Sequence, residues 1–223
     1  MIKVVVFDMD DTLFLERDYV LSGFLAVDRY LELKGISGFY NKSKELFESE
    51  VRGNIFNEVF EYFSIPYSNK DIKDLVDIYR NHMPNIKLLG ESSWVISQLT
   101  SRYQLGLITD GYLNAQQNKA KALGLADYFH NIIFTDQFGR EYWKPSERPY
   151  IEMKNFFNVM HHELVYIGDN PKKDFIAAKK LGWKTVHIAR VDSEYSNVII
   201  SEDYQADYKV SSLYEIPTLI ERL

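Results

Sequence analysis

The chain contains no cysteine among its 223 residues. This absence excludes disulfide bonds, thiol catalysis and thiolate ligands for a metal ion. Long hydrophobic runs are absent as well, since no stretch approaches the roughly 20 apolar residues of a membrane span. The apolar run at residues 1–7 is too short for a signal peptide and ends in an acidic cluster. We therefore expect a cytoplasmic protein without a membrane partner.

Positive charge is also scarce, with 26 Lys and Arg residues against 32 Asp and Glu residues and a formal net charge of −6. Such a chain has no general attraction for nucleic acid, so we expect no nucleic-acid partner. A site for a phosphate group would have to create its own local positive potential. The chain also lacks a Walker-type loop and a G-x-G-x-x-G motif, which excludes nucleotide-cofactor binding of those kinds.

What the sequence does contain is a series of short apolar, β-branched runs that alternate with helical patterns. The runs are mostly apolar rather than alternating, which is typical of strands buried on both faces of a parallel sheet. We predict strands at 3–8, 104–110, 131–136, 164–169 and 184–189, a weaker strand at 207–210, and helices near 91–102, 113–123, 149–159 and 173–181. This order predicts an α/β fold with a doubly wound, Rossmann-like parallel sheet.

A helical insertion separates the first strand from the second. Its turn signals divide four helical patterns, at 18–33, 42–51, 54–63 and 69–80. We therefore predict an all-α cap domain at 15–88 and a catalytic core formed by 1–14 and 89–223. The cap is expected over the carboxyl ends of the strands, where α/β domains bind their ligands.

Aspartates gather at the ends of the predicted strands. Asp110, Asp136 and Asp169 each end one, but Asp is common at turns and helix N-termini, so capping and function stay equally open for Asp110 and Asp136. Asp8 and Asp10 differ, because two residues apart on extended backbone they point to the same side. Two carboxylates held close repel each other and need a cation between them or a proton on one of them.

A calcium-binding EF-hand loop is one alternative for this acidic cluster. That loop requires glycine at its sixth position and a bidentate glutamate at its twelfth. Leu13 and Tyr19 occupy those two positions when the loop is counted from Asp8. The EF-hand interpretation therefore fails.

Three further features follow the acidic cluster in order along the chain: Thr109 at the end of the second strand, Lys144 before a proline, and a G-D-x-x-x-x-D pattern at 168–174. Together with the D-x-D-x-T pattern at 8–12, they resemble the four motifs of the haloacid dehalogenase-like superfamily. The resemblance covers about residues 3–190, and the helical insertion after the first motif is similar to that of its capped phosphatase branch.

The resemblance implies a Mg²⁺ cofactor, which oxygen ligands without His or Cys suit. Its ligands would be Asp8, the backbone carbonyl of Asp10, and Asp169. Asp174 would support the site, through a bound water or by fixing Lys144.

The resemblance also implies roles in catalysis. Asp8 would attack phosphorus and form an aspartyl phosphate, and Asp10 would protonate the leaving alkoxide and then deprotonate the attacking water. Lys144, the Thr109 hydroxyl and backbone N–H groups near Asp110 and Gly111 would bind the phosphate group of the substrate. Thr12 is expected to fix the turn through a hydrogen bond to backbone.

We therefore expect a phosphatase for a small phosphate ester, such as a sugar phosphate or a nucleoside monophosphate. The dehalogenases of the superfamily lack an acid at the position of Asp10, so this residue favours phosphoryl chemistry. A phosphomutase with the same motifs is the alternative, and a non-catalytic binding protein on this fold is a further one. Lys119, on the helix after Thr109, is expected on a solvated face.

Overall fold

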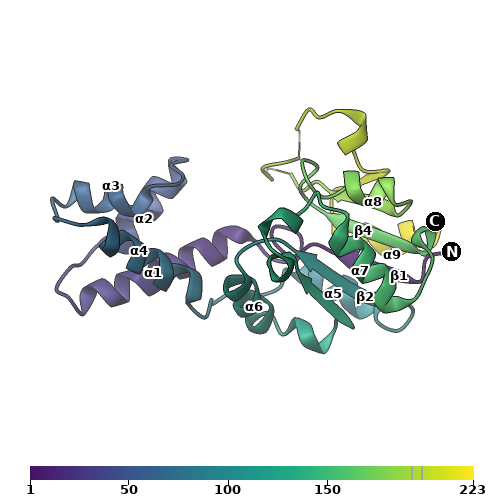
Figure 1. The fold of residues 1–223 in the computed structure, drawn as a ribbon, viewed down its shortest axis with the longest axis horizontal. Coiled ribbons are helices and arrows are strands. Elements are labelled where there is room, and N and C mark those ends of the chain that lie inside the picture. The colour runs from purple at the N-terminus through teal and green to yellow at the C-terminus, as the bar shows by residue number, and fades with distance from the viewer. Residues whose placement is uncertain (192, 197) are drawn as a thin grey trace. The chain divides into compact units, whose positions relative to one another are not determined.

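The computed structural model describes residues 1–191, 193–196 and 198–223. Contacts between residues divide them into two compact units, an α/β unit of Met1–Leu15 with Lys87–Leu223 and a helical unit of Glu16–Ile86 (Figure 1). Within the described residues, no helix is both long and apolar enough to cross a membrane.

The α/β unit is built on a six-stranded, fully parallel sheet with the order β3-β2-β1-β4-β5-β6. The strands are β1 (Val4–Phe7), β2 (Gln104–Thr109), β3 (Asn131–Phe134), β4 (Leu164–Gly168), β5 (Lys184–Ile188) and β6 (Tyr208–Val210). The prediction of a doubly wound parallel sheet is confirmed, and the weak sixth strand is present.

Helices cover this sheet because its central strands have no polar face. All residues of β1 and β4 are buried. Val4 and Val6 point to one face and join a core with Tyr150 and Met153 of α7 and with Ala177 of α8. The helices of the unit are α5 (Gly90–Leu99), α6 (Leu113–Ala122), α7 (Arg148–Phe157), α8 (Ile176–Lys180) and α9 (Ile216–Ile220).

Short 3₁₀ turns connect several of these elements, at Leu125–Asp127, Thr135–Phe138, Arg140–Tyr142, His161–Glu163, Glu202–Tyr204 and Leu213–Glu215. The sequence pattern did not indicate them. The predicted helix at 173–181 is also shorter than expected, since α8 begins only at Ile176. A turn that the backbone N–H of Asp174 closes on the carbonyl of Asn170 occupies the preceding residues.

The helical unit has a hydrophobic core of its own. It consists of α1 (Glu16–Glu32), α2 (Phe39–Glu48), α3 (Ile55–Tyr62) and α4 (Asn69–Asn81), so each predicted helix is present with shifted ends. Phe24 and Val27 of α1 pack with Phe39, Phe56 and Leu75 from the other three helices. This packing among its own helices stabilises the unit.

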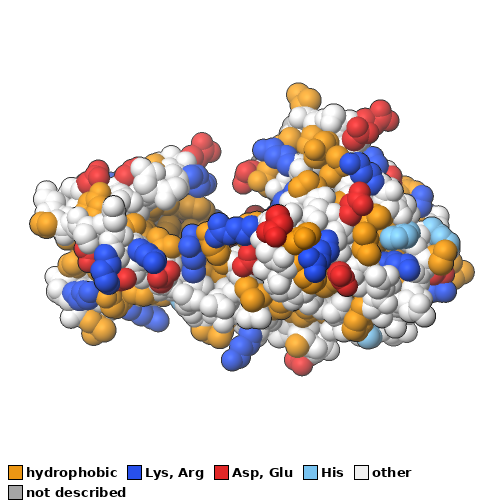
Figure 2. Space-filling view, in the orientation of Figure 1, with side chains coloured by type: hydrophobic (Ala, Val, Ile, Leu, Met, Phe, Trp, Pro, Cys, Tyr) orange, Lys and Arg blue, Asp and Glu red, His pale blue; other side chains and the backbone are white. Residues whose placement is uncertain are grey.

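The surface carries charges of both signs. Figure 2 shows Lys and Arg side chains interspersed with Asp and Glu side chains on the visible face of each unit, without a basic stripe. This mixture agrees with the net charge of −6.

The strand order reverses at β1, which lies between β2 and β4. In sheets of this type ligands bind outside the carboxyl ends of the strands at such a switch point. Phe7 at the end of β1 pairs with Ile167 of β4, so Asp8 and Asp169 follow neighbouring strands at the same edge. The sheet topology thus brings together two parts of the sequence about 160 residues apart.

Candidate active site

Asp8 leaves β1 directly into a buried environment. Its backbone N–H continues the sheet with a 2.8 Å hydrogen bond to the carbonyl of Ile167, which fixes where its side chain begins. The residue is only 3% exposed. Burial raises the pKa of the Asp8 carboxyl to about 7, against the lowering effect of the nearby Lys144 ammonium.

Lys144 is the central cation of the site, and its side chain is fully buried. Its ammonium donates to Asp8 Oδ1 at 2.6 Å, to Asp174 Oδ1 at 2.7 Å and to the Tyr166 hydroxyl at 2.9 Å. Burial alone would lower the pKa of Lys144, but the carboxylates of Asp174 and Asp8 hold it well above its ordinary value. The lysine therefore stays charged and joins the first motif to the last.

Three buried carboxylates surround this lysine. One oxygen each of Asp8, Asp169 and Asp174 lies within 4.8 Å of the others. Burial, followed by the charges of Asp174 and Asp8, raises the pKa of Asp169 well above its ordinary range. The Lys144 ammonium does not by itself balance three carboxylates, and the donor atoms are all oxygen. The set therefore fits a hard divalent cation.

The turn after β4 is shaped around Asp174. The carboxylate Oδ2 of Asp174 accepts the backbone N–H of Asn170 at 2.9 Å and so closes the turn on itself. A Cβ atom on Gly168 would lie 2.5 Å from the same oxygen. Glycine at this position is thus what allows Asp174 to reach both its own turn and Lys144.

Asp10 is bound by two side chains of α6. Gln116 Nε2 donates to its Oδ2 at 2.7 Å, and Lys119 Nζ lies 2.8 Å from its Oδ1. Lys119 is 3% exposed, so the expectation of a solvated face is wrong at this residue. The helix turns Lys119 inward because an ion pair with Asp10 offsets the desolvation of its charge.

The second motif lies at the end of β2 and in the loop that follows it. Thr109 is fully buried, and its hydroxyl oxygen accepts a 2.7 Å hydrogen bond from Gln116. Asp110 Oδ1 accepts the Thr135 hydroxyl at 2.8 Å and the backbone N–H of Lys144 at 3.0 Å. The Asp110 side chain therefore holds the Lys144 loop, a contact that its position at a strand end did not indicate.

Gly111 has a positive φ of 132°, and a Cβ atom there would lie 3.0 Å from the Gln116 side chain. Lys173 reaches the same region, with its ammonium 3.2 Å from Asp110 Oδ2. For Asp136, capping and function were both left open by the sequence. Its carboxylate accepts the backbone N–H of Leu113, the first residue of α6, and the indole N–H of Trp143. Its carboxylate caps the helix, which is the structural alternative given above.

The first-motif turn is fixed differently from what was expected for Thr12. Among the described residues the buried Thr12 hydroxyl has no hydrogen-bond partner, so the expected bond to backbone is wrong. The guanidinium of Arg190 instead donates to the carbonyls of Asp11 and Thr12, at 2.6 and 2.8 Å. Glu91 pairs with the Arg190 Nε at 2.5 Å. We call this arrangement of Arg190 and Glu91 the clamp of the first-motif turn. Neither residue belongs to a motif, so the sequence offered no signal for it.

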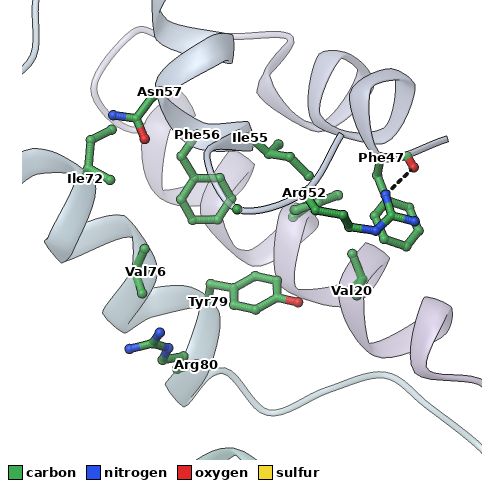
Figure 3. Close-up of a pocket in the computed structure, with 12 residues that line it drawn as sticks. Val20, Phe47, Arg52, Ile55, Phe56, Asn57, Ile72, Val76, Tyr79 and Arg80 are labelled. Atoms are coloured by element: carbon green, nitrogen blue, oxygen red, sulfur yellow. Dashed lines mark hydrogen bonds between the residues drawn. The ribbon is translucent and has the colours of Figure 1, made fainter. Parts of the chain in front are cut away.

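The helical unit contains a separate cavity of about 270 Å³. Figure 3 shows the rings of Phe56 and Tyr79 beside it and the Arg52 guanidinium over the ring of Phe47. Arg52 Nη1 donates to the carbonyls of Phe47 and Val51, at 2.8 and 2.9 Å. Among the residues that the structure describes, two arginines and no acidic residue line the cavity, which is otherwise mostly apolar.

Comparison with known proteins gives consistent results. The sequence model of the haloacid dehalogenase-like hydrolase family matches residues 5–188. The chain is 25% identical over 237 residues to the glyceraldehyde 3-phosphate phosphatase of Methanocaldococcus jannaschii, covering 100% of this chain and 99% of that protein. It is 30% identical over 194 residues to the protein of the same name from Pyrococcus abyssi, covering 83% and 81%.

The fold has close counterparts among solved structures. The HAD-hydrolase YfnB from Bacillus subtilis, solved bound to magnesium, superposes with a TM-score of 0.72 over 98% of both chains. The two sequences are only 14% identical, so this similarity concerns the fold alone.

Proposed function

The chain belongs to the haloacid dehalogenase-like hydrolase family, and from this premise we propose that it is a magnesium-dependent phosphatase acting on a small phosphorylated metabolite. The observation that carries the proposal is the buried contact of Lys144 with both Asp8 and Asp174, next to Asp169. This arrangement combines a carboxylate nucleophile with the positive charge that a phosphate ester needs to approach it.

Asp8, Asp169 and the backbone carbonyl of Asp10 would hold the Mg²⁺ ion. The bound ion would supply charge neutralisation between the carboxylates and the phosphate oxygens. Asp174 supports the site by holding Lys144 at 2.7 Å. The all-oxygen donor set and the surplus of buried negative charge support this assignment.

Asp8 is the proposed nucleophile. Its carboxylate forms a bond to phosphorus while the bond to the leaving oxygen breaks, which gives an aspartyl phosphate. Lys144 lies beside the attacking carboxylate and balances the charge of the phosphoryl group, and Thr109 with the backbone of Asp110 and Gly111 binds its oxygens. The buried position of Asp8 excludes competing water.

Asp10 is the proposed proton carrier. It donates a proton to the departing alkoxide and then accepts one from the water that hydrolyses the aspartyl phosphate. Both transfers require a carboxyl group in a fixed place, and Asp10 has side-chain partners on both of its oxygens.

The relatives named glyceraldehyde 3-phosphate phosphatase cover this chain almost completely and support a small three-carbon or similar phosphate ester as substrate. We propose that the helical unit, as a cap, selects the substrate. Its cavity has positive charge and an apolar lining, which suits an anionic metabolite better than a cation.

The test is release of inorganic phosphate from a panel of triose phosphates, hexose phosphates, nucleoside monophosphates and pyrophosphate. Activity should require Mg²⁺ and disappear with excess EDTA, and Ca²⁺ should inhibit because its larger and looser coordination shell displaces the nucleophile. Full turnover in excess EDTA would contradict the metal assignment. Isomerised sugar phosphate without net phosphate release would favour a mutase instead.

A further inference from the structure

Two neighbouring side chains on one face of α6 hold the carboxylate of Asp10, one on each oxygen. Gln116 donates to Oδ2 at 2.7 Å and Lys119 to Oδ1 at 2.8 Å. The two residues are three apart, so they lie on the same side of the helix. They are 1% and 3% exposed, whereas the Asp10 side chain is 27% exposed. The accessible carboxylate is thus fixed from its buried side.

The burial of Lys119 is informative because an ammonium is costly to remove from water without a charged partner. Lys121 and Gln117, on the same helix, remain exposed. The pattern therefore separates two residues that face Asp10 from two chemically identical residues that do not. A helix that needed only to pack against the sheet would place apolar residues at 116 and 119, as it does with Ala115 and Ala120.

Gln116 also contacts the second motif. Its amide nitrogen lies 2.7 Å from Thr109 Oγ1 and 2.6 Å from the carbonyl of Asp110. An amide NH₂ group carries two hydrogens, so Asp10 Oδ2, Thr109 Oγ1 and the Asp110 carbonyl share them. When Thr109 Oγ1 accepts one of them, the hydrogen of its own hydroxyl points in another direction. That hydrogen is then available for a phosphoryl oxygen.

We propose that Gln116 and Lys119 are positioning residues. Both fix the plane of the Asp10 carboxylate for proton transfer, and Gln116 in addition directs the Thr109 hydroxyl toward the phosphoryl group. The inference rests on the proposed function, in which Asp10 is the proton carrier. Its physical basis is that a misplaced catalytic group loses much of its effect even when it keeps its chemistry.

The test compares two substrates that differ in their need for a proton. An alkyl phosphate such as glycerol phosphate needs an acid to release its alkoxide, whereas p-nitrophenyl phosphate releases a stable anion without one. In Lys119→Met and Gln116→Leu, kcat/KM for the alkyl ester should fall about 10-fold to 100-fold. For Lys119→Met, kcat/KM for the aryl ester should stay within about 3-fold, because this constant reports only the first chemical step. Gln116→Leu should lower kcat/KM for the aryl ester somewhat more than Lys119→Met does, because it also removes the contact of Gln116 with the Thr109 hydroxyl.

The exposed neighbours provide matched controls. Lys121→Met and Gln117→Leu make the same chemical changes on the same helix and should leave both substrates unaffected. Far-ultraviolet circular dichroism and thermal unfolding of each variant establish that it is folded. If one buried variant fails to fold, the other still tests the inference, since each removes one of the two donors.

Asp10→Asn in the same assay separates the positioning role of Gln116 and Lys119 from the proposed role of Asp10 as proton carrier. If Asp10→Asn shows the leaving-group dependence while Lys119→Met and Gln116→Leu lower both substrates equally or not at all, the positioning inference is overturned and the proposed function stands. If Asp10→Asn itself shows no leaving-group dependence, the role of Asp10 in the proposed function is overturned, and the inference with it. A shared dependence in all three variants supports both.

Discussion

At the scale of single residues, Asp8 and Asp10 are the same amino acid in two different environments. Asp8 is 3% exposed and bound to a buried lysine, whereas Asp10 has 27% of its side chain exposed and is bound from α6. Burial raises the pKa of Asp8 to about 7, so this carboxylate depends on Lys144 and on a bound cation to remain ionised. The two residues should therefore fail in different ways when mutated.

The first prediction follows from that difference. Asp8→Asn removes the attacking carboxylate, so no phosphoenzyme can form. Asp10→Asn keeps the nucleophile but removes the base of the second step, so an aryl phosphate should phosphorylate the protein and the aspartyl phosphate should accumulate. Intact-protein mass spectrometry after a rapid acid quench measures the added phosphoryl group. The reverse pattern, or phosphorylation of another residue, would contradict the roles given to the two aspartates.

The second prediction concerns Lys144. Replacing it with Met should lower kcat about 10²-fold to 10³-fold, the loss typical of one preorganised charge-stabilising donor. Tyr166→Phe, the matched control, removes the 2.9 Å contact of the hydroxyl with Lys144 and its 3.4 Å hydrogen bond to the carbonyl of Ile108, and it leaves the lysine paired with both carboxylates. Its kcat should fall much less, and so should that of Thr109→Val, which removes a neutral donor. Steady-state kinetics at saturating Mg²⁺ decides, and wild-type kcat/KM in Lys144→Met would exclude a role in phosphate binding.

At the scale of elements, the sequence predicts the sheet and the family well, because buried parallel strands and ordered motifs are local patterns. Three of the motifs follow the neighbouring parallel strands β1, β2 and β4, so they must meet at one edge of the sheet. The structure also brings Lys144, from the segment after β3, within hydrogen-bond distance of Asp8 and Asp174. The roles of these residues stay predictions.

The contacts that could not be predicted from the sequence join side chains that lie far apart in the chain. The polar stretch around Gln116 and Lys119 is typical of an exposed helix, and only the position of Asp10, more than 100 residues earlier, turns these residues inward. The same holds for Arg190, which contacts Asp11 and Thr12 from the end of β5. Periodicity describes the face of an isolated helix, and it cannot show which charge that face will meet.

The third prediction concerns the clamp formed by Glu91 of α5 and Arg190, which follows β5. Burial alone would raise the pKa of Glu91, but hydrogen bonds from the Ser212 hydroxyl and the Arg190 guanidinium hold it below its ordinary value of 4.5. A carboxyl whose pKa is lowered by folding stabilises the protein above its unfolded pKa, and the contribution is lost as the pH falls through the folded pKa. Glu91→Gln should therefore lower the free energy of unfolding by about 1–2 kcal/mol at pH 7.

Chemical denaturation at pH 7 and at pH 3 tests this, since the difference between Glu91→Gln and wild type should shrink at the lower pH. Glu221→Gln is the matched control, because its pair with Arg102 leaves both side chains about half exposed. Exposed pairs contribute roughly 0–1 kcal/mol. A pH-independent effect of Glu91→Gln would show that the carboxylate charge does not hold the clamp.

At the scale of the whole molecule, the two units differ in what they contribute. The α/β unit holds every motif residue, and the helical unit has a separate hydrophobic core and a cavity of its own. The chain leaves and re-enters the α/β unit at adjacent points, since the backbone N–H of Leu89 donates to the carbonyl of Leu13 at 3.0 Å. The helical unit can therefore be replaced by a short linker without stretching the sheet.

The last prediction uses this geometry. Deleting residues 16–86 and joining Leu15 to Lys87 through a short Gly-Ser linker should leave a folded α/β unit, because the core cluster around Val4, Tyr150 and Tyr166 is formed by this unit's own residues. The truncated protein should retain Mg²⁺-dependent hydrolysis of p-nitrophenyl phosphate, because the leaving group of this ester needs no proton and all motif residues remain. Its discrimination among triose, hexose and nucleoside phosphates should shrink, since the residues proposed to select the substrate are gone.

Circular dichroism checks folding, and the ratio of kcat/KM values across the substrate panel is the measurement. A folded truncation with the substrate ranking of the full chain would place specificity in the α/β unit, and the polar residues around Asp10 and Lys173 would then be the ones to exchange.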